Sequence, residues 1–204
     1  MSKSLLEYAG EIPDEESSAL DAWRSGLSRF SKEDMFAAFE HILRQSREDG
    51  LTGLLRRPAF RNIAEGVLQR ARGKGGKTAS VIMLDADHFK EVNDGAGGHA
   101  AGDKALVFLA QAIQKAGRPT DVVCRRGGDE FAVLLPNTNC AQAIAVAERI
   151  RKQVAEDLSS FGVTVSVGVT CTGKTFDFDA LINRSDKALR NAKDEGKSRV
   201  RFLS

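Results

Sequence analysis

The chain has 204 residues, of which 42% are hydrophobic and 28% charged, as expected for one folded domain with a modest extension and not for a disordered chain. The formal net charge of +2 is too small to indicate a nucleic-acid polymer or a membrane surface as a partner. No window approaches the roughly 20 apolar residues of a membrane span, and the acidic N-terminal region does not resemble a signal peptide. Cys124, Cys140 and Cys171 lack CxxC spacing and are interpreted as reduced thiols, which predicts a cytoplasmic protein.

The first 47 residues carry two amphipathic helix patterns. Their apolar positions are Leu20, Trp23, Leu27 and Phe30 in the first pattern, and Phe36, Phe39 and Leu43 in the second. Ser31 followed by Asp34 is typical of a helix N-cap, and Asp49-Gly50 interrupts the second pattern. We therefore expect a helical segment over residues 1–47, which would drive pairing, dock a sensor protein or cap the sheet, and one domain over residues 48–204.

Strand and helix patterns alternate through the second part of the chain. The expected helices cover 58–71, a short stretch from Phe89, 101–116, 141–155 and 178–194, and the expected strands cover 79–85, 121–126, 131–135, 162–169 and 198–203. Because the central strand pair forms an antiparallel hairpin, these elements predict an α+β fold with a palm-like mixed sheet flanked by helices. The basic loop 72–77 lacks phosphate-loop spacing and is interpreted as a solvated turn.

Acidic residues stand at two strand ends. Gly127 and Gly128 suit a tight hairpin turn, because glycine takes positive φ without steric cost, and on their own they fit an ordinary exposed hairpin. Asp129 and Glu130 follow them directly, while Asp85 ends the apolar strand that starts at residue 79. Carboxylates at strand ends beside a glycine turn can hold a hard divalent cation together with nucleotide phosphates.

An ordered set of motifs resembles the GGDEF domain, the catalytic unit of diguanylate cyclases, over residues 49–203. The motifs are Asp49-Gly-Leu-Thr-Gly-Leu54, Asp85-Ala-Asp87-His-Phe-Lys90, Asn93-Asp94, Gly98-His99-Ala-Ala-Gly102-Asp103, Gly127-Gly128-Asp129-Glu130-Phe131, Val165-Ser-Val-Gly-Val169 and Ala188-Leu-Arg-Asn-Ala-Lys193-Asp-Glu-Gly196. The resemblance implies the palm-like fold of nucleotidyl cyclases. It also implies a homodimer that condenses two GTP molecules, one per subunit, into cyclic di-GMP and two pyrophosphates.

The same resemblance assigns the catalytic carboxylates. Asp85 and Asp129 match ligands of Mg²⁺, with Mn²⁺ as an alternative ion, and the carbonyl of Ala86 matches a backbone ligand. Magnesium suits such a site because one or two carboxylates, phosphate oxygens and water complete its octahedral shell. Glu130 is implied to be necessary for activity, either as a ligand of a second metal or in deprotonation of the attacking 3′-hydroxyl.

The implied triphosphate contacts come from distant parts of the sequence. His88 and Phe89 would offer backbone amides at the start of a short helix, and Lys90 follows them. Lys193 and Lys197 are four residues apart and can point to one side. The glycine turn, Gly127 and Gly128, belongs to the same implied substrate site.

Guanine recognition is implied for Asn93 and Asp103. A carboxylate accepts hydrogen bonds from the N1–H and the exocyclic amine of guanine, a pair that adenine lacks, so Asp103 favours GTP over ATP. The segment from Asn93 to His99 is one residue longer than is usual in the family, and the extra residue lies between the two guanine-reading side chains. Arg56, Arg190 and Lys197 also depart from the usual residues.

Arg118-Pro119-Thr120-Asp121 matches the RxxD product-inhibition site of the family, and Arg149 matches a secondary arginine contact there. Two functions therefore remain open: an active, product-inhibited diguanylate cyclase, or a catalytically weak module that binds cyclic di-GMP or GTP and regulates a partner. The intact pentapeptide and Asp85 favour the enzyme, whereas the extra residue favours the weak module.

Overall fold

The computed structural model describes residues 31, 33–34, 37, 46–73, 78–173 and 175–204. The chain divides into two units, Met1–Arg47 and Glu48–Ser204. The first predicted helix pattern, from Leu20 to Phe30, lies outside the described residues, and so does most of the second pattern. At the start of the second pattern, Asp34 N–H donates to Ser31 Oγ at 3.0 Å and Ser31 N–H donates to Asp34 Oδ2 at 3.1 Å, which is the predicted N-cap arrangement.

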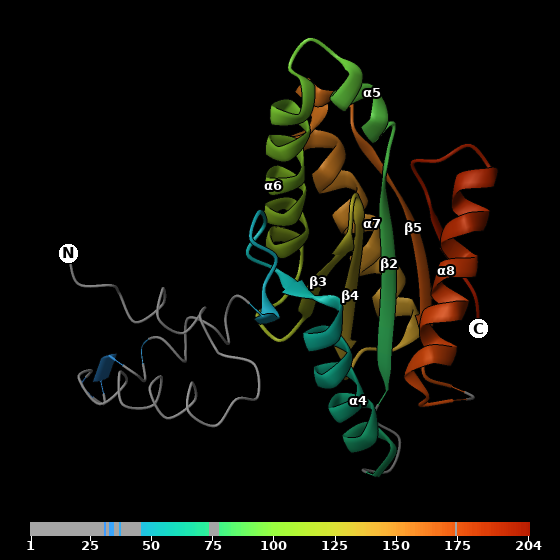
Figure 1. Ribbon diagram of the computed structural model, residues 1–204. Coiled ribbons are helices and arrows are strands. Elements are labelled where there is room, and N and C mark those ends of the chain that lie inside the picture. Colours follow the sequence, from blue (N-terminus) through green and yellow to red (C-terminus); the bar gives the residue numbers. More distant parts are fainter. Residues whose placement is uncertain (1–30, 32, 35–36, 38–45, 74–77, 174) are drawn as a thin grey trace, which may run out of the picture. The chain divides into compact units, whose positions relative to one another are not determined.

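A six-stranded mixed sheet forms the middle of the second unit, in the order β1-β3-β4-β2-β5-β6 (Figure 1). The strands are β1 Leu55–Arg56, β2 Ala79–Asp87, β3 Val122–Gly127, β4 Glu130–Pro136, β5 Thr164–Cys171 and β6 Val200–Phe202. The central strand β2 runs antiparallel to β4 and β5, whereas β1–β3 and β5–β6 are parallel pairs. All nine residues of β2 are buried, and apart from Ser80 every residue before its first carboxylate, Asp85, is apolar.

Helices cover both faces of the sheet (Figure 1). They are α4 Arg57–Gly73, α5 Phe89–Asp94, α6 Gly98–Ala116, α7 Cys140–Asp157 and α8 Phe178–Asp194, with a 3₁₀ turn at Ser159–Phe161. Ile82 and Leu84 of β2 face one core with α6 and α7, while Val81 and Met83 face the other with α4 and α8. This alternation is the period of two that a strand imposes, and it confirms the predicted α+β fold. None of the described helices is both long and apolar enough to cross a membrane.

The predicted elements differ from the observed ones mainly at their ends. The helix expected from residue 101 begins at Gly98, and the strand expected from residue 162 begins at Thr164. The strand β1 was not predicted, because two residues are too few to show a periodic pattern. Of the loop interpreted as a solvated turn, Arg72 and Gly73 belong to α4, and residues 74–77 lie outside the described residues.

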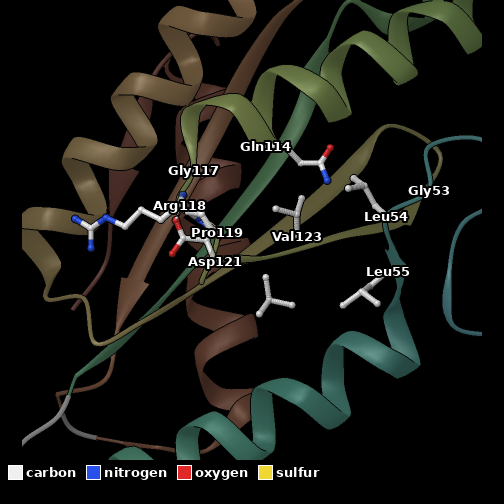
Figure 2. A pocket seen from close by; sticks show the side chains of 10 residues that line it. Gly53, Leu54, Leu55, Gln114, Gly117, Arg118, Pro119, Asp121 and Val123 are labelled. Carbon is white, nitrogen blue, oxygen red and sulfur yellow. Dashed lines mark hydrogen bonds between the residues drawn. The ribbon is translucent and has the colours of Figure 1, made fainter.

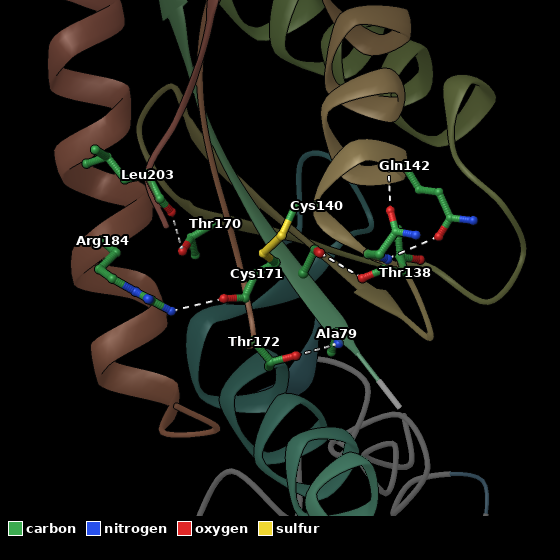
Figure 3. Close-up of a disulfide and its surroundings, with 11 residues drawn as sticks. Ala79, Thr138, Cys140, Gln142, Thr170, Cys171, Thr172, Arg184 and Leu203 are labelled. Atoms are coloured by element: carbon green, nitrogen blue, oxygen red, sulfur yellow. Dashed lines mark hydrogen bonds between the residues drawn. A yellow bond between two sulfur atoms is a disulfide. The ribbon is translucent and has the colours of Figure 1, made fainter. Parts of the chain in front are cut away.

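The prediction of three reduced cysteines is wrong for two of them. Cys140 and Cys171 form a disulfide with Cα atoms 5.5 Å apart (Figure 3), and only Cys124 is free. The partners are 31 residues apart in sequence and match no short motif, so only the folded arrangement of α7 and β5 reveals the pair. Because two of the three cysteines form a disulfide, the cysteines no longer support the prediction of a cytoplasmic protein.

Helix α8 packs directly on β5 at Gly168. A Cβ added to this glycine would lie 2.1 Å from the carbonyl oxygen of Ser185 and 2.3 Å from the amide nitrogen of Leu189. Both are backbone atoms of α8, so they cannot yield by a change of rotamer. The absence of a side chain at Gly168 therefore sets how closely α8, which carries Lys193, approaches the sheet.

We expect Gly168→Ala to lower the free energy of unfolding by about 2–3 kcal/mol, because the helix must move off the strand. Urea unfolding measures this difference. Gly50→Ala is the matched control, since no atom lies within 4 Å of the added Cβ, and its effect should stay within about 0.5 kcal/mol. Equal effects of the two substitutions would contradict the close contact at Gly168.

Candidate functional site

Three carboxylates converge where β2 ends beside the β3–β4 hairpin. Asp85 of β2 is opposite Glu130 of β4 in the antiparallel register, and the amide of Ala86 donates to the carbonyl of Asp129 at 3.3 Å. Asp85 is 9% exposed, Asp129 is half-buried and Glu130 is exposed, so the group runs from the core to the solvent. The structure thus brings together the three acidic residues that the sequence singled out.

The hairpin turn depends on its two glycines. Gly127 has φ of 148° and Gly128 has φ of 51°, both in regions that side chains with a Cβ rarely adopt. Arg125 donates to the carbonyl oxygen of Gly128 twice, from Nε at 2.9 Å and from Nη2 at 2.8 Å. The backbone that presents Asp129 is therefore fixed from both sides, by the Ala86 amide and by the Arg125 guanidinium.

Lys193 of α8 is the nearest cation to the buried acid, with its Nζ 2.7 Å from Asp85 Oδ2. Burial raises the pKa of Asp85 above its ordinary value; Lys193 lowers it in part, and repulsion from Asp129 and Glu130 raises it again. One lysine therefore does not fully balance the negative charge of the carboxylates at this end of β2. A hard cation bound by carboxylate oxygens would supply the missing charge, so the residues fit a magnesium or manganese ion.

The protein ligands for such an ion are few. In the described part of the chain, no three His, Cys, Asp or Glu side chains form a cluster able to hold a metal by themselves. The set that fits is Asp85, Asp129 and the carbonyl of Ala86, with the remaining ligands from phosphate and water. Magnesium accepts such an incomplete protein shell, because it keeps several waters when it binds proteins.

Asp87 organises the turn after α8. Its buried carboxylate accepts hydrogen bonds from Thr164 Oγ1 at 2.8 Å, Ser166 Oγ at 2.7 Å and the backbone N–H of Ser198 at 3.0 Å. Lys197 and Ser198 both have positive φ, at 60° and 44°, so this turn needs a specific anchor. Asp87 thereby fixes the position of Lys197, a role that the sequence analysis missed because its partners lie far away in the chain.

The short helix α5 follows β2 directly. His88 precedes it with φ of 62°, and its Nδ1 lies 2.8 Å from Glu91 Oε1. Phe89 opens the helix, and Lys90 is exposed. His88, Phe89 and Lys90 thus lie at the same end of β2 as Asp85, as their sequence positions require.

Asn93 and Asp103 lie on neighbouring helices. A Cβ at Gly102 would come within 2.0 Å of Asn93 Oδ1, so Asn93 of α5 packs against the residue that precedes Asp103 of α6. The extra residue falls in the exposed turn 95–97, which Gly98 N–H closes onto the carbonyl of Gly95 at 3.0 Å. The extra residue therefore lies at the surface, and α5 packs against α6.

Arg118 and Asp121 form one tight turn at the entrance to β3. The backbone N–H of Arg118 donates to Asp121 Oδ2 at 2.8 Å, and the N–H of Asp121 donates to the carbonyl of Arg118 at 2.9 Å. The carboxylate is thus engaged with backbone, while the Arg118 side chain is exposed. Arg149 reaches this region from α7, where its Nε donates to the carbonyl of Ala116 at 2.6 Å.

Two pockets flank the Arg118 turn. One, of about 490 Å³, is bounded by this turn, the end of α6 and residues 53–55 (Figure 2). The other, of about 520 Å³, is lined by Val67, Arg70, Arg118, Val122 and Asn137, among others. An exposed arginine between two hollows of this size is a suitable contact for a phosphate or the edge of a base.

A brace from Asp49 to the glycine turn escaped the sequence analysis. Asp49 Oδ1 accepts from Thr52 N–H at 3.0 Å, Thr52 Oγ1 at 2.7 Å and Arg125 Nη1 at 2.9 Å. Burial alone would raise the pKa of Asp49, but the hydrogen bonds from Thr52 and Arg125 outweigh it and lower the pKa. The signal available in the sequence was the pair Arg125 and Arg126, two charged residues that follow the apolar start of this strand and stand beside the turn.

A second arginine of the hairpin lies on the α8 side. Arg126 Nη1 is 3.2 Å from Asp186 Oδ1 and 3.9 Å from Glu130 Oε2. These residues, with Leu189, Arg190 and Lys193, line a pocket of about 350 Å³. Glu130 therefore has a cation beside it, in addition to the neighbouring acids.

The comparisons with known proteins agree with this fold. Residues 46–199 match the family described as "Diguanylate cyclase, GGDEF domain", and the chain therefore belongs to the GGDEF domain family. Diguanylate cyclase A of Treponema denticola is 42% identical over 63% of this chain and 36% of its own length. Diguanylate cyclase DgcM of Escherichia coli is 38% identical over 79% of this chain and 39% of its own length. The chain thus spans well under half the length of these curated relatives.

Solved structures show the same architecture. The coiled coil and GGDEF domain of DgcB from Caulobacter crescentus, in complex with c-di-GMP, superposes with a TM-score of 0.76 at 30% identity, covering 91% of this chain and 100% of that one. Diguanylate cyclase SiaD in complex with its activator SiaC, from Pseudomonas aeruginosa, gives a TM-score of 0.70 at 29% identity, covering 97% of this chain and 80% of that one.

The Arg125 brace predicts a specific loss of rigidity. Arg125→Lys removes the two hydrogen bonds that Nε and Nη2 donate to the Gly128 carbonyl, because a lysine ammonium cannot donate from two fixed nitrogens. We expect amide hydrogen exchange of residues 127–130 to become about tenfold faster, as the loss of a hydrogen bond to a charged group implies. Arg151→Lys, which alters an ion pair with Glu148 within α7, should leave that exchange unchanged. Unaltered exchange in the Arg125 variant would contradict the brace.

Proposed function

We propose that this chain is a diguanylate cyclase module that joins two GTP molecules, one bound to each chain of a homodimer, into cyclic di-GMP and two pyrophosphates. The observation that carries this proposal is that Asp85, Asp129 and Glu130 lie together at one end of the central strands β2 and β4, with Lys193 Nζ 2.7 Å from Asp85. Membership of the GGDEF family and relatives named as diguanylate cyclases support the same reaction.

In this proposal, Asp85, Asp129 and the carbonyl of Ala86 hold Mg²⁺, with Mn²⁺ as the alternative. When bound, the ion neutralises charge on the reacting phosphate, which is the main requirement of phosphoryl transfer. Glu130 either holds a second ion or accepts the proton of the 3′-hydroxyl. Its exposure and its distance of 3.9 Å from Arg126 leave its carboxylate available for both roles.

The chain's own cations orient the triphosphate. Lys90 approaches from α5 and Lys193 from α8, while Lys197 extends from the turn that Asp87 anchors. The amides around His88 and Phe89 and the glycines of the hairpin turn complete this side. A lysine has a flexible stem and a compact charge, so Lys193 can contact either Asp85 or a phosphate oxygen.

Guanine selection is assigned to Asn93 and Asp103. The carboxylate of Asp103 accepts from two donors of guanine, and the Asn93 amide both donates and accepts. ATP would leave these groups without partners, at a cost of about 1–3 kcal/mol, which corresponds to tenfold or greater discrimination. The packing of Asn93 against Gly102 supports the pairing of the two side chains despite the longer loop.

Two chains are needed because each supplies one GTP. We assign residues 1–47 to pairing or to docking an activating partner. The relatives supply the precedent: the DgcB structure contains a coiled coil beside its GGDEF domain, and SiaD is bound to its activator SiaC. We place the reaction in the cytoplasm, because GTP is available there.

Product inhibition is assigned to Arg118, Asp121 and Arg149. Asp121 holds the turn by accepting from the Arg118 amide, which leaves the Arg118 guanidinium exposed for an anionic ligand. The alternative function, a weak module that binds cyclic di-GMP or GTP, was favoured by the extra residue at 95–97. That residue lies in an exposed turn, which supports the enzyme, and an assay separates the two functions.

The direct test is incubation of the purified chain with GTP and Mg²⁺, followed by chromatography for cyclic di-GMP. We expect product, formed at a rate per chain that rises with protein concentration until dimers saturate. Asp85→Asn should abolish turnover, because it removes a metal ligand and its charge. Absence of product at high protein concentration, with cyclic di-GMP still bound, would select the receptor function instead.

The same Asp85→Asn variant should be slightly more stable than the parent without added metal. Because the pKa of Asp85 is raised in the folded chain, its charge costs folding free energy at neutral pH. This cost decreases as the pH falls through the folded-state pKa, and it is absent below the pKa of the unfolded chain. We expect a higher melting temperature at pH 7, with the difference narrowing toward pH 4. Scanning calorimetry at both pH values measures it. A variant less stable than the parent at pH 7 would show that the Lys193 ion pair outweighs the burial cost.

Arg118→Ala should weaken inhibition by added cyclic di-GMP by about tenfold or more, as the loss of a bidentate charged contact implies. The measurement is the inhibition curve at fixed GTP. Arg151→Ala, on the same helix as Arg149 but paired with Glu148, is the control and should be inhibited like the parent. Parent-like inhibition of the Arg118 variant would remove this turn from the product site.

A further inference from the structure

The disulfide joins the first residue of α7 to the last residue of β5, and hydrogen bonds that do not involve sulfur also hold both positions. On the β5 side, Thr172 N–H donates to the carbonyl of Ala79 at 2.8 Å. Ala79 N–H donates to Thr172 Oγ1 at 2.9 Å, and Arg184 Nη2 donates to the carbonyl of Cys171 at 3.0 Å (Figure 3). The Cα separation of 5.5 Å lies in the middle of the range for disulfides. The cysteines are therefore arranged so that the bond can form or open with little movement.

The α7 side is equally well fixed. Asn139 and Gln142 form a reciprocal capping box around the start of the helix, with hydrogen bonds of 2.9 and 3.0 Å. Just before it, Thr138 N–H donates to the carbonyl of Thr78 at 3.1 Å and Ser80 Oγ donates to the carbonyl of Thr138 at 2.8 Å. None of these hydrogen bonds involves sulfur, so they are available to hold Cys140 in either oxidation state.

The three cysteines differ in access. Cys171 is 5% exposed, whereas Cys140 is half-buried and can be reached from solvent. Cys124 lies buried in β3, where burial raises the pKa of its thiol to about 12, so it stays protonated at ordinary pH. Thiol–disulfide exchange is therefore expected at Cys140 and Cys171 and not at Cys124.

The pair lies at the opposite end of β2 from the carboxylates. Ser80, near the start of β2, is opposite Cys171, whereas Asp85 is five residues further along the same strand. The intervening residues of β2 are buried and paired on both sides. A change in the disulfide thus affects the junction of α7, β5 and β2 without contacting the proposed metal ligands.

We propose that Cys140 and Cys171 form a reversible thiol–disulfide modification site, which reacts with small disulfides such as glutathione disulfide. The Cys140 thiolate attacks one sulfur of glutathione disulfide, forms a mixed disulfide and releases one glutathione thiolate. The Cys171 thiol then gives its proton to water, attacks the Cys140 sulfur and releases the second glutathione. The two protein thiols lose two electrons and two protons in total, and glutathione disulfide gains them as two thiols. A dithiol reductant reverses the sequence.

The consequence of oxidation is a covalent link across a segment that contains all of α7 and β5. Such a link stabilises a fold chiefly by restricting the unfolded chain. The effect should be largest for global unfolding and for local opening at residues 138–141 and 170–172. The hairpin at residues 127–130 should not change.

The test uses the full chain, equilibrated either with glutathione disulfide or with dithiothreitol, and then alkylated under denaturing conditions for mass spectrometry. We expect one alkylated cysteine in the oxidised protein and three in the reduced protein. The oxidised protein should melt about 5–10 °C higher. Its amides at 138–141 and 170–172 should exchange more slowly, with unchanged exchange at 127–130.

Cys140→Ser provides the matched variant, because it keeps the buried partner in place. It should show two alkylated cysteines and one melting temperature under both conditions. Three alkylated cysteines after exposure to glutathione disulfide, a stable mixed disulfide at Cys140, or equal melting temperatures of the two parent forms would each overturn the proposal. None of these measurements depends on cyclase activity, so the outcome is separate from that of the proposed function.

Discussion

The antiparallel register between β2 and β4 is the constraint on which the site depends. It puts Asp85 opposite Glu130 and lets the Ala86 amide bind the carbonyl of Asp129. Side chains alternate along a strand, so a slip of one residue would turn Asp85 to the other face and bury different groups. The apolar residues 81–84 of β2 pack alternately into two cores, so such a slip would misplace side chains in both cores at once and is disfavoured.

The register brings like charges together, and the surrounding cations limit the cost. Lys193 contacts Asp85, Arg126 lies between Asp186 and Glu130, and Arg125 binds the Gly128 carbonyl. These cations come from β3 and α8, and the approach of α8 in turn depends on Gly168. The acidic tip is therefore held in a fixed geometry while Asp85 remains short of positive charge. Fixed polar groups of this kind are what electrostatic stabilisation of a phosphoryl-transfer reaction requires.

Local patterns were sufficient to predict the order of the helices and of strands β2 to β6, and to single out three acidic residues that lie at neighbouring positions, because periodicity and adjacent motifs are properties of short segments. Contacts between distant residues were missed. Asp49 and Arg125 are 76 residues apart, and Asp87 binds Ser198 across 111 residues. No periodic pattern links such pairs, and each becomes visible only when the sheet brings its strands together. The cysteine pair failed for the same reason: spacing arguments recognise short motifs, whereas the contact between α7 and β5 depends on the whole sheet.

The two ends of β2 differ in what they contribute. At the end with Asp85, a buried charge with a raised pKa and several positive-φ residues reduce stability, as is typical where function constrains a structure. At the end with Ala79, the disulfide and the hydrogen bonds of Thr172 and Thr138 add stability, and no buried side-chain nitrogen or oxygen of these residues lacks a partner. Because one rigid strand connects the ends, stability gained at Ala79 can offset the cost at Asp85 without altering the position of the carboxylates. The carboxylates lie at one end of β2 and the stabilising contacts at the other, which explains how the domain can retain an electrostatically unfavourable cluster of acids within a well-packed fold.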